Sequence, residues 1–272
     1  MALQVVPWVL VRLGQSVLAI ESSSVREMLR LPHTTSVPNV GPEVRGVVTL
    51  RDRAMPVVDL RQLLGMPSLV EDAETLNATL VQRAEDHRQW VTELDASVTE
   101  RREFTLTVDP HLCAFGKWYD AFRSTSVVLD SHLKRFDQPH KAIHALGATV
   151  ADLVRQNRSD DAHAVIAKAR ATTLATLMQL FDETPKILAE MNREMLVVLS
   201  DGEQLIGVTA DAVESVEPVL QETVADIDLP REARGHGPVT QTARTAKGEQ
   251  LVLILNAKML LAQFARAQAT AA

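Results

Sequence analysis

Residues 46–65, GVVTLRDRAMPVVDLRQLLG, contain the pattern that decides the fold class. Two short apolar segments, GVVTL and MPVVDL, flank the charged tetrapeptide RDRA, as in two β-strands joined by a turn. The Leu-rich segment that follows predicts the start of a short helix. The same strand-rich character extends over residues 5–65 and returns over 194–262, in WVLVRLG, SVLAI, EMLVVLSDGEQLIGV and EQLVLILN.

Residues 70–191 have a different composition, with long windows of Ala, Leu, Glu, Arg and Gln and few glycines. This composition is typical of helices. Strand-rich ends around a helical middle favour one β-domain that is interrupted by a helical insertion. The alternative is three separate domains, which would leave each β-part with only about 65 residues, a small size for an independent core.

The two strand-rich parts align with each other. VLVRLGQSVLAIESSSVREML (9–29) and LVVLSDGEQLIGVTADAVESV (196–216) each show a strand, a turn, a second strand and a Val-containing segment with glutamates. MPVVDLRQLL (55–64) and LVLILNAKML (251–260) each show an apolar strand, Asp or Asn, and a Leu-rich helix start. Unless such short patterns align by chance, two β-units of the same plan flank the helical block.

These flanks resemble the CheW-like domain, the adaptor fold that couples chemoreceptors to the histidine kinase CheA. VRLGQSVLAI, LPHTTSVPNVGPEVRGVVTLRDRAMPVVDLRQLLG and LIGVTADAVESV carry the resemblance. It implies two five-stranded, mostly antiparallel, SH3-like barrels packed side by side. It also implies that Gly46, Leu50 and Arg51 bind a chemoreceptor or a CheA-type kinase, whereas without the resemblance Arg51 reads as a solvated surface arginine. Family members usually show Asn-Leu-Arg-Gly where this chain has TLRD, so Asp52 replaces the glycine of the turn. Asn256 stands where an Asp is common.

Composition restricts the function classes. The net charge of −7 argues against a nucleic-acid or anionic-membrane surface, and no apolar run reaches the length of a membrane span. One cysteine forms no internal disulfide, which fits a reducing cytoplasm, so we expect a cytoplasmic protein without membrane insertion. Phosphate-binding loops, a Gly-x-Ser-x-Gly elbow and carboxylates paired with histidine are absent from the flanks, and we expect no enzymatic activity.

Histidines at helical spacing mark the middle block. His140 and His144 are four residues apart, so they share one face of a helix, with Asp137 expected as its cap and Pro139 in its first turn. His87 lies on an apolar stripe that also contains Leu80, Ala84, Val91 and Leu94, where a core histidine bonded to a neighbour is the alternative to a metal ligand.

Cys113 completes a candidate ligand set. Asp109 and Pro110 predict a helix start that places Cys113 in the first turn, where the thiolate is favoured. His111 lies about 200° away from Cys113 around a helix and is expected to face solvent, as are His132 and His163. His87, Cys113, His140 and His144 form a Cys-His₃ set of the kind that zinc prefers, and four ligands leave no open position for a catalytic water.

CAFGKWY and LKRFDQPHKAIH carry a second resemblance, to the chemoreceptor zinc-binding (CZB) domain, over roughly residues 75–185. In that family a first-helix histidine, the cysteine of Cys-x-x-Gly-Lys-Trp-Tyr and Pro-His-x-x-x-His hold one zinc ion, and the matching positions are His87, Cys113, His140 and His144. The resemblance implies a four-helix bundle that senses zinc, or oxidants such as hypochlorous acid through the zinc-bound thiolate of Cys113.

The sequence therefore predicts a CheW-like domain in two parts, 1–68 and 192–272, around a CZB-like zinc-binding bundle at 69–191. Pro67 and Pro185 are expected to limit helix continuation at the two joints. The expected function is a signalling adaptor between chemoreceptors and a CheA-type kinase, modulated by a Zn²⁺ site with Cys113 as its redox-sensitive ligand. A purely structural zinc and a zinc hydrolase are the alternatives, and a homodimer through the bundle is an arrangement that the sequence leaves open.

Overall fold

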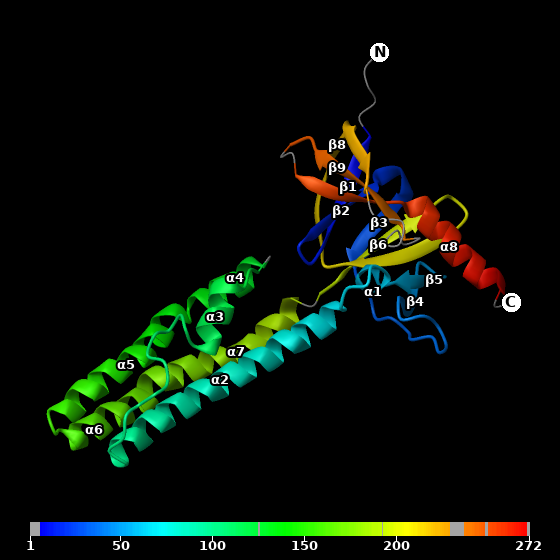
Figure 1. Ribbon diagram of the computed structural model, residues 1–272. Helices are drawn as coiled ribbons and strands as arrows, with labels where there is room; N and C mark the ends of the chain where they lie inside the picture. Colours follow the sequence, from blue (N-terminus) through cyan, green and yellow to red (C-terminus); the bar gives the residue numbers. More distant parts are fainter. Residues whose placement is uncertain (1–5, 125, 192, 229–236, 248–249, 271–272) are drawn as a thin grey trace. The chain divides into compact units, whose positions relative to one another are not determined.

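The computed structural model describes residues 6–124, 126–191, 193–228, 237–247 and 250–270. The chain forms two compact units, one made of Met1–Glu71 with Asn192–Ala272 and one of Asp72–Met191. Strands build the first unit and helices build the second (Figure 1).

The β-unit is assembled from both ends of the chain. Its first half contains β1 (Pro7–Leu13), β2 (Ser16–Glu21), η1 (Ser22–Ser24), β3 (Val25–Arg30), β4 (Val44–Leu50), β5 (Arg53–Val58) and α1 (Leu60–Leu63). Its second half contains β6 (Met195–Ser200), β7 (Leu205–Ala210), β8 (Ala212–Asp226), β9 (Val239–Thr245), β10 (Leu251–Leu255) and α8 (Ala257–Thr270).

The strands form two sheets of the same plan. One is a closed barrel in the order β1-β2-β10-β9-β8, and the other is a five-stranded sheet in the order β3-β6-β7-β5-β4. If β1–β5 are laid over β6–β10, each order maps onto the other, including the parallel pairs β2–β10 and β5–β7. Each half therefore gives its first two strands to one sheet and its last three strands to the other. This topology confirms the internal repeat and the CheW-like fold class.

The second sheet differs from the expected barrel. Among the described residues, β3 and β4 are its two edges and do not pair with each other. Beyond β4, the described part of the chain adds an isolated bridge between Thr35 and Val47. The sequence-based prediction also missed β3, β8 and β9 as strands, because β3 alternates with exposed arginines and β8 and β9 contain few fully buried residues.

The core of the β-unit lies between and inside the sheets. One apolar cluster joins residues of both sheets, such as Val11, Ile20, Val197 and Val208, and α8 packs Leu260 against it. Four consecutive residues of β2, Val17–Ile20, are buried, because one face of this strand lines the shared core and the other lines the barrel. The continuous apolar runs of the sequence thus correspond to strands covered on both faces.

The helical unit contains α2 (Leu69–Thr99), α3 (Ala114–Ala121), α4 (Val127–Lys134), α5 (Asp137–Arg155), α6 (Ser159–Ala169), the π-helical segment η2 (Arg170–Leu174) and α7 (Ala175–Met191). α6, η2 and α7 follow one another without a break, and α5 follows α4 after two residues. The bundle thus combines three long helical stretches with the short α3. Pro185 lies inside α7, so the prediction that it limits the helix was wrong, and α7 continues to Met191.

Candidate metal centre

The four predicted ligand residues lie together in the helical unit. His87 comes from the middle of α2, Cys113 directly precedes α3, and His140 and His144 lie one turn apart on α5. Their ligand atoms all lie within 4.8 Å of one another. In a tetrahedral zinc site with three nitrogens and one sulfur, neighbouring ligand atoms are about 3.4–3.6 Å apart, so a small convergence completes the site.

The imidazoles are oriented for metal binding by hydrogen bonds on their outer nitrogens. Nδ1 of His87 lies 2.7 Å from the Arg83 carbonyl oxygen, and Nδ1 of His144 lies 3.3 Å from the Thr107 carbonyl oxygen. Because a carbonyl oxygen can only accept a hydrogen bond, Nδ1 carries the proton and donates it in this bond. Nε2 then keeps its lone pair, which is free to bind a metal ion. Both Nε2 atoms are buried and lack a hydrogen-bond partner. Buried polar atoms without partners are rare, and here a cation would supply the missing interaction.

The sulfur of Cys113 belongs to the same cluster of ligand atoms. Its Sγ is 3.2 Å from Nε2 of His140, and it accepts a hydrogen bond of 3.1 Å from the Gly116 amide. Cys113 is the N-cap of α3, which begins at Ala114, so the prediction of a helix start at Asp109 and Pro110 was wrong. The cap position still aims a helix N-terminus at the sulfur.

Gly116 makes this turn sterically feasible. A Cβ atom at this position would stand 1.8 Å from the Pro110 carbonyl oxygen, so only glycine lets the preceding loop approach the helix backbone. Gly147 on α5 has a similar role, because a Cβ there would stand 2.5 Å from Cγ1 of Val108. The loop before α3 is thus pressed onto both helices and holds Cys113 beside His140.

Burial of the cluster shifts the pKa values of its four residues. Burial, together with the neighbouring His87, lowers the pKa of His140 to about 3 and that of His144 to about 4. Burial also lowers the pKa of His87, so the imidazoles stay neutral, the form that binds metal. Burial raises the pKa of the Cys113 thiol against the opposing effect of the Gly116 amide. The helix N-terminus alone therefore does not ionise this thiol.

An apolar shell surrounds the cluster. The ring of Phe115 packs edge-on against His140 at a centroid distance of 4.8 Å, and Trp90 lies 5.1 Å from His144. The Trp90 indole donates a hydrogen bond of 2.9 Å to the Thr107 carbonyl oxygen, which also faces His144. Such packing fixes the rings and limits access of water to the site. The predicted stripe on α2 is buried as expected.

The remaining histidines of the bundle are not part of the cluster. His111 is exposed, as predicted, and its Nδ1 lies 2.8 Å from Asp120. His163 is partly exposed, with Nδ1 2.7 Å from Asp95. His132 is buried, so the prediction of a surface position was wrong; its Nε2 lies 3.0 Å from both the Leu180 carbonyl oxygen and Oγ1 of Thr184. Its place on the buried stripe with Leu129, Leu133 and Phe136 was a signal available in the sequence.

One correction concerns the start of α5. Phe136 occupies the N-cap position without a side-chain cap, and Asp137 is the first helical residue instead of the cap. Pro139 does lie in the first turn. Asp137 instead pairs with Lys141 at 2.8 Å, one turn along the helix.

The predicted partner-binding residues lie on β4 and the turn after it. Gly46 is buried with φ 137°, and a Cβ there would stand 2.2 Å from the Thr35 carbonyl oxygen, so this glycine lets the loop before β4 cross the strand. Arg51 and Asp52 form the turn to β5 with φ 49° and 62°, a conformation that Asp tolerates better than most residues. The Arg51 guanidinium is largely exposed and pairs with Glu27 at 2.9 Å.

The fold and the site define a double β-fold that carries a helical insertion with a buried Cys-His₃ cluster. The model of the CheW-like domain matches residues 7–92, and the model of the chemoreceptor zinc-binding domain matches residues 87–151. The chain thus combines a CheW-like domain with a chemoreceptor zinc-binding domain. Neither is an enzyme family, in line with the sequence-based expectation.

Among solved structures, the chain is similar to the crystal structure of scaffolding protein TtCheW from Thermoanaerobacter tengcongensis. The identity is 11%, the TM-score is 0.41, and the match covers 92% of this chain and 88% of that chain. No curated protein matches the chain in sequence. Within the described residues, no helix has the length and apolar character needed to cross a membrane.

Proposed function

We propose that the chain is a chemotaxis adaptor whose helical insertion binds Zn²⁺ through His87, Cys113, His140 and His144. The observation that carries the proposal is the pair of buried, unpartnered Nε2 atoms of His87 and His144, which face a cluster completed by Cys113 and His140. Bound zinc would stabilise the thiolate of Cys113 and lower its pKa. Four protein ligands leave no open position for a water nucleophile, which disfavours a hydrolase.

In this proposal the site senses zinc or an oxidant. Oxidation of the Cys113 thiolate by hypochlorous acid gives a sulfenic acid and chloride: sulfur gains the oxygen and loses two electrons, and chlorine is reduced. A sulfenic acid is a poorer zinc ligand than a thiolate, so oxidation, like loss of zinc, would end the connection of Cys113 to the three histidines through a shared metal ion. The loop before α3 would then lose its anchor on α5, and the bundle would settle into a second state.

The proposed output is a change in affinity for chemoreceptors and a CheA-type kinase. The binding surface is assigned to β4 and its turn, with Gly46 shaping the strand and Leu50 and Arg51 supplying contacts. These contacts border a small pocket with an apolar floor and a basic rim, lined by Arg26, Glu27, Leu50, Arg51, Arg53, Met55, Val198 and Leu205. Such a pocket suits an apolar side chain flanked by acidic residues. The division of the chain after Glu71 and before Asn192 supports the proposed domain boundaries at 68/69 and 191/192.

Replacing Cys113 with Ala tests the proposal, with the exposed His111→Ala as a matched control. We expect about one zinc per wild-type chain and at least tenfold weaker zinc binding in the Cys113 variant, with the control unchanged. Affinity for the CheA-type kinase of the same organism should differ between zinc-loaded and zinc-free wild type. Unchanged zinc binding in the Cys113 variant would remove this residue from the site. Loss of zinc with unchanged kinase affinity would leave a purely structural zinc.

A further inference from the structure

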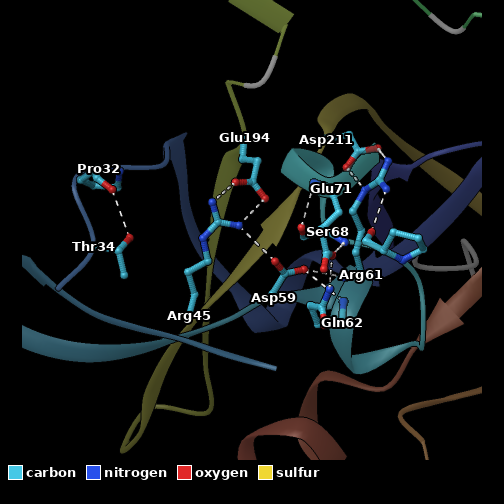
Figure 2. A network of polar contacts seen from close by, with 11 residues as sticks. Pro32, Thr34, Arg45, Asp59, Arg61, Gln62, Ser68, Glu71, Glu194 and Asp211 are labelled. Carbon is cyan, nitrogen blue, oxygen red and sulfur yellow. Dashed lines mark hydrogen bonds and ion pairs between the residues drawn. The ribbon is translucent and has the colours of Figure 1, made fainter. Parts of the chain in front are cut away.

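Arg45 on β4 joins two buried carboxylates that stand near the two ends of the helical insertion (Figure 2). Its guanidinium contacts both carboxylate oxygens of Glu194, with Nη1 at 3.1 Å from Oε1 and Nη2 at 2.7 Å from Oε2. Nη1 also lies 3.1 Å from Oδ2 of Asp59. The side chains of Asp59 and Glu194 are 3% and 4% exposed, which separates this cluster from an ordinary surface ion pair.

Glu194 belongs to the segment by which the chain returns from the bundle. It stands three residues after the end of α7 at Met191 and directly before β6. Its backbone carbonyl accepts a hydrogen bond of 2.9 Å from the Leu31 amide, so its position is fixed on the main chain as well. Burial raises the pKa of Glu194, and Arg45 opposes this effect. Without Arg45, two buried carboxylates would face each other uncompensated.

Asp59 is connected by hydrogen bonds to the segment by which the chain enters the bundle. It caps α1 by accepting hydrogen bonds from the amides of Arg61 and Gln62 at 3.0 and 3.2 Å. The Gln62 side chain donates a bond of 3.0 Å to Glu71, and Glu71 forms a capping box with Ser68 at the start of α2. The first turn of α2 is therefore linked to β4 through Glu71, Gln62, Asp59 and Arg45 (Figure 2).

These contacts converge on the strand that carries the assigned binding surface. Gly46 follows Arg45 directly, and β4 ends at Leu50, next to the turn with Arg51. β4 is also an edge of its sheet, where the described part of the chain adds the isolated bridge between Thr35 and Val47 but no further strand, so it can shift more easily than an interior strand.

We propose that Arg45 is a positioning residue that couples the conformation of β4 and its turn to the conformation of the helical insertion. This inference rests on the proposed function, in which release of Cys113 changes the bundle. A change that moves the end of α7 or the first turn of α2 displaces Glu194 or Asp59, and the guanidinium transmits the displacement to β4. The coupling requires only that the two bundle states differ in how well they hold these carboxylates in place.

Hydrogen exchange of the backbone amides over residues 44–58 tests this inference without a partner protein. In the wild type, we expect zinc removal by a chelator to change exchange in this segment by about threefold or more. In Arg45→Met, which keeps the aliphatic stem and removes the fork, this change should fall below about 1.5-fold, while the zinc content stays the same. Glu194→Gln removes the carboxylate charge that Arg45 binds and should likewise reduce the zinc-dependent change in exchange. This variant serves as the test if Arg45→Met does not fold.

Arg30→Met, at an exposed arginine on β3 of the same sheet, is the control and should respond to zinc like the wild type. A full zinc response in folded Arg45→Met and Glu194→Gln would overturn the inference and leave the proposed function intact. Unchanged hydrogen exchange over residues 44–58 of the wild type, after complete removal of zinc, would overturn the inference as well. If zinc removal also left kinase affinity unchanged, the regulatory part of the proposed function would fail with it.

Discussion

At the scale of single residues, the neutral imidazoles of His140 and His144 make the stability of the zinc-free protein depend on pH. Burial holds their pKa values at about 3 and about 4, whereas an unfolded histidine has a pKa of about 6.5. Between these values the unfolded state binds more protons, so the free energy of unfolding decreases as the pH falls. From pH 7 to pH 5 we expect a loss of about 1–2 kcal/mol for each of the two histidines.

Urea unfolding at pH 7 and pH 5, after zinc removal, measures this loss. His140→Leu should lose less stability on acidification than the wild type, because one depressed pKa has been removed. His111→Asn changes an exposed histidine and should keep the wild-type difference. Equal stability of the wild type at the two pH values would contradict the assignment of neutral, buried imidazoles.

At the scale of elements, the seating of α3 depends on Gly116. We expect Gly116→Ala to destabilise the bundle by more than about 2 kcal/mol and to abolish zinc binding, because the new Cβ would collide with the Pro110 carbonyl oxygen. Gly147→Ala is the comparison, since its Cβ meets the side chain of Val108, which can move. Zinc titration and urea unfolding of both variants give the result. A smaller effect for Gly116→Ala than for Gly147→Ala would show that the loop is not held by this contact.

The elements also show how far the sequence leads. Apolar runs and helical spacing predicted the strands around Gly46 and the ligand set, because burial imposes these periodicities directly. Pro185 was misjudged because packing of α7 outweighs the local cost of a proline inside a helix. The cap role of Cys113 was missed because the loop that replaces the expected helix turn depends on Gly116, a tertiary contact. The network around Arg45 was equally hidden, since Asp59 and Glu194 are far apart in sequence.

At the scale of the whole molecule, the insertion stands between the two halves of the duplicated β-plan. It follows α1, the last element of the first half, and precedes β6, the first element of the second. The halves still pair across it, through β3 with β6 and through β5 with β7. Because each sheet takes two strands from one half and three from the other, neither sheet can form from one half alone. In the topology of the β-fold, the bundle therefore takes the place of a loop that connects α1 to β6. It is nevertheless large enough to form a compact unit of its own.

This arrangement predicts that zinc stabilises the two units unequally. The proposed ligands all belong to the bundle, so zinc at about 1,000 times its dissociation constant should raise the bundle's unfolding free energy by about 4 kcal/mol. The β-unit has its own clusters of buried apolar residues and should gain much less. Fluorine NMR of protein labelled with fluorotryptophan separates the two, because Trp8 lies on β1 whereas Trp90 and Trp118 lie on α2 and α3.

In a urea titration with and without zinc, the midpoints of the Trp90 and Trp118 signals should move to higher urea, and that of Trp8 should move less. Cys113→Ala should remove the zinc-dependent shift at both bundle positions. Unchanged midpoints at Trp90 and Trp118 in the wild type would place any bound zinc outside the bundle. An equal shift of all three would mean that the two units unfold as one cooperative block, in which case the connections at Glu71 and Glu194 carry stability as well as signal.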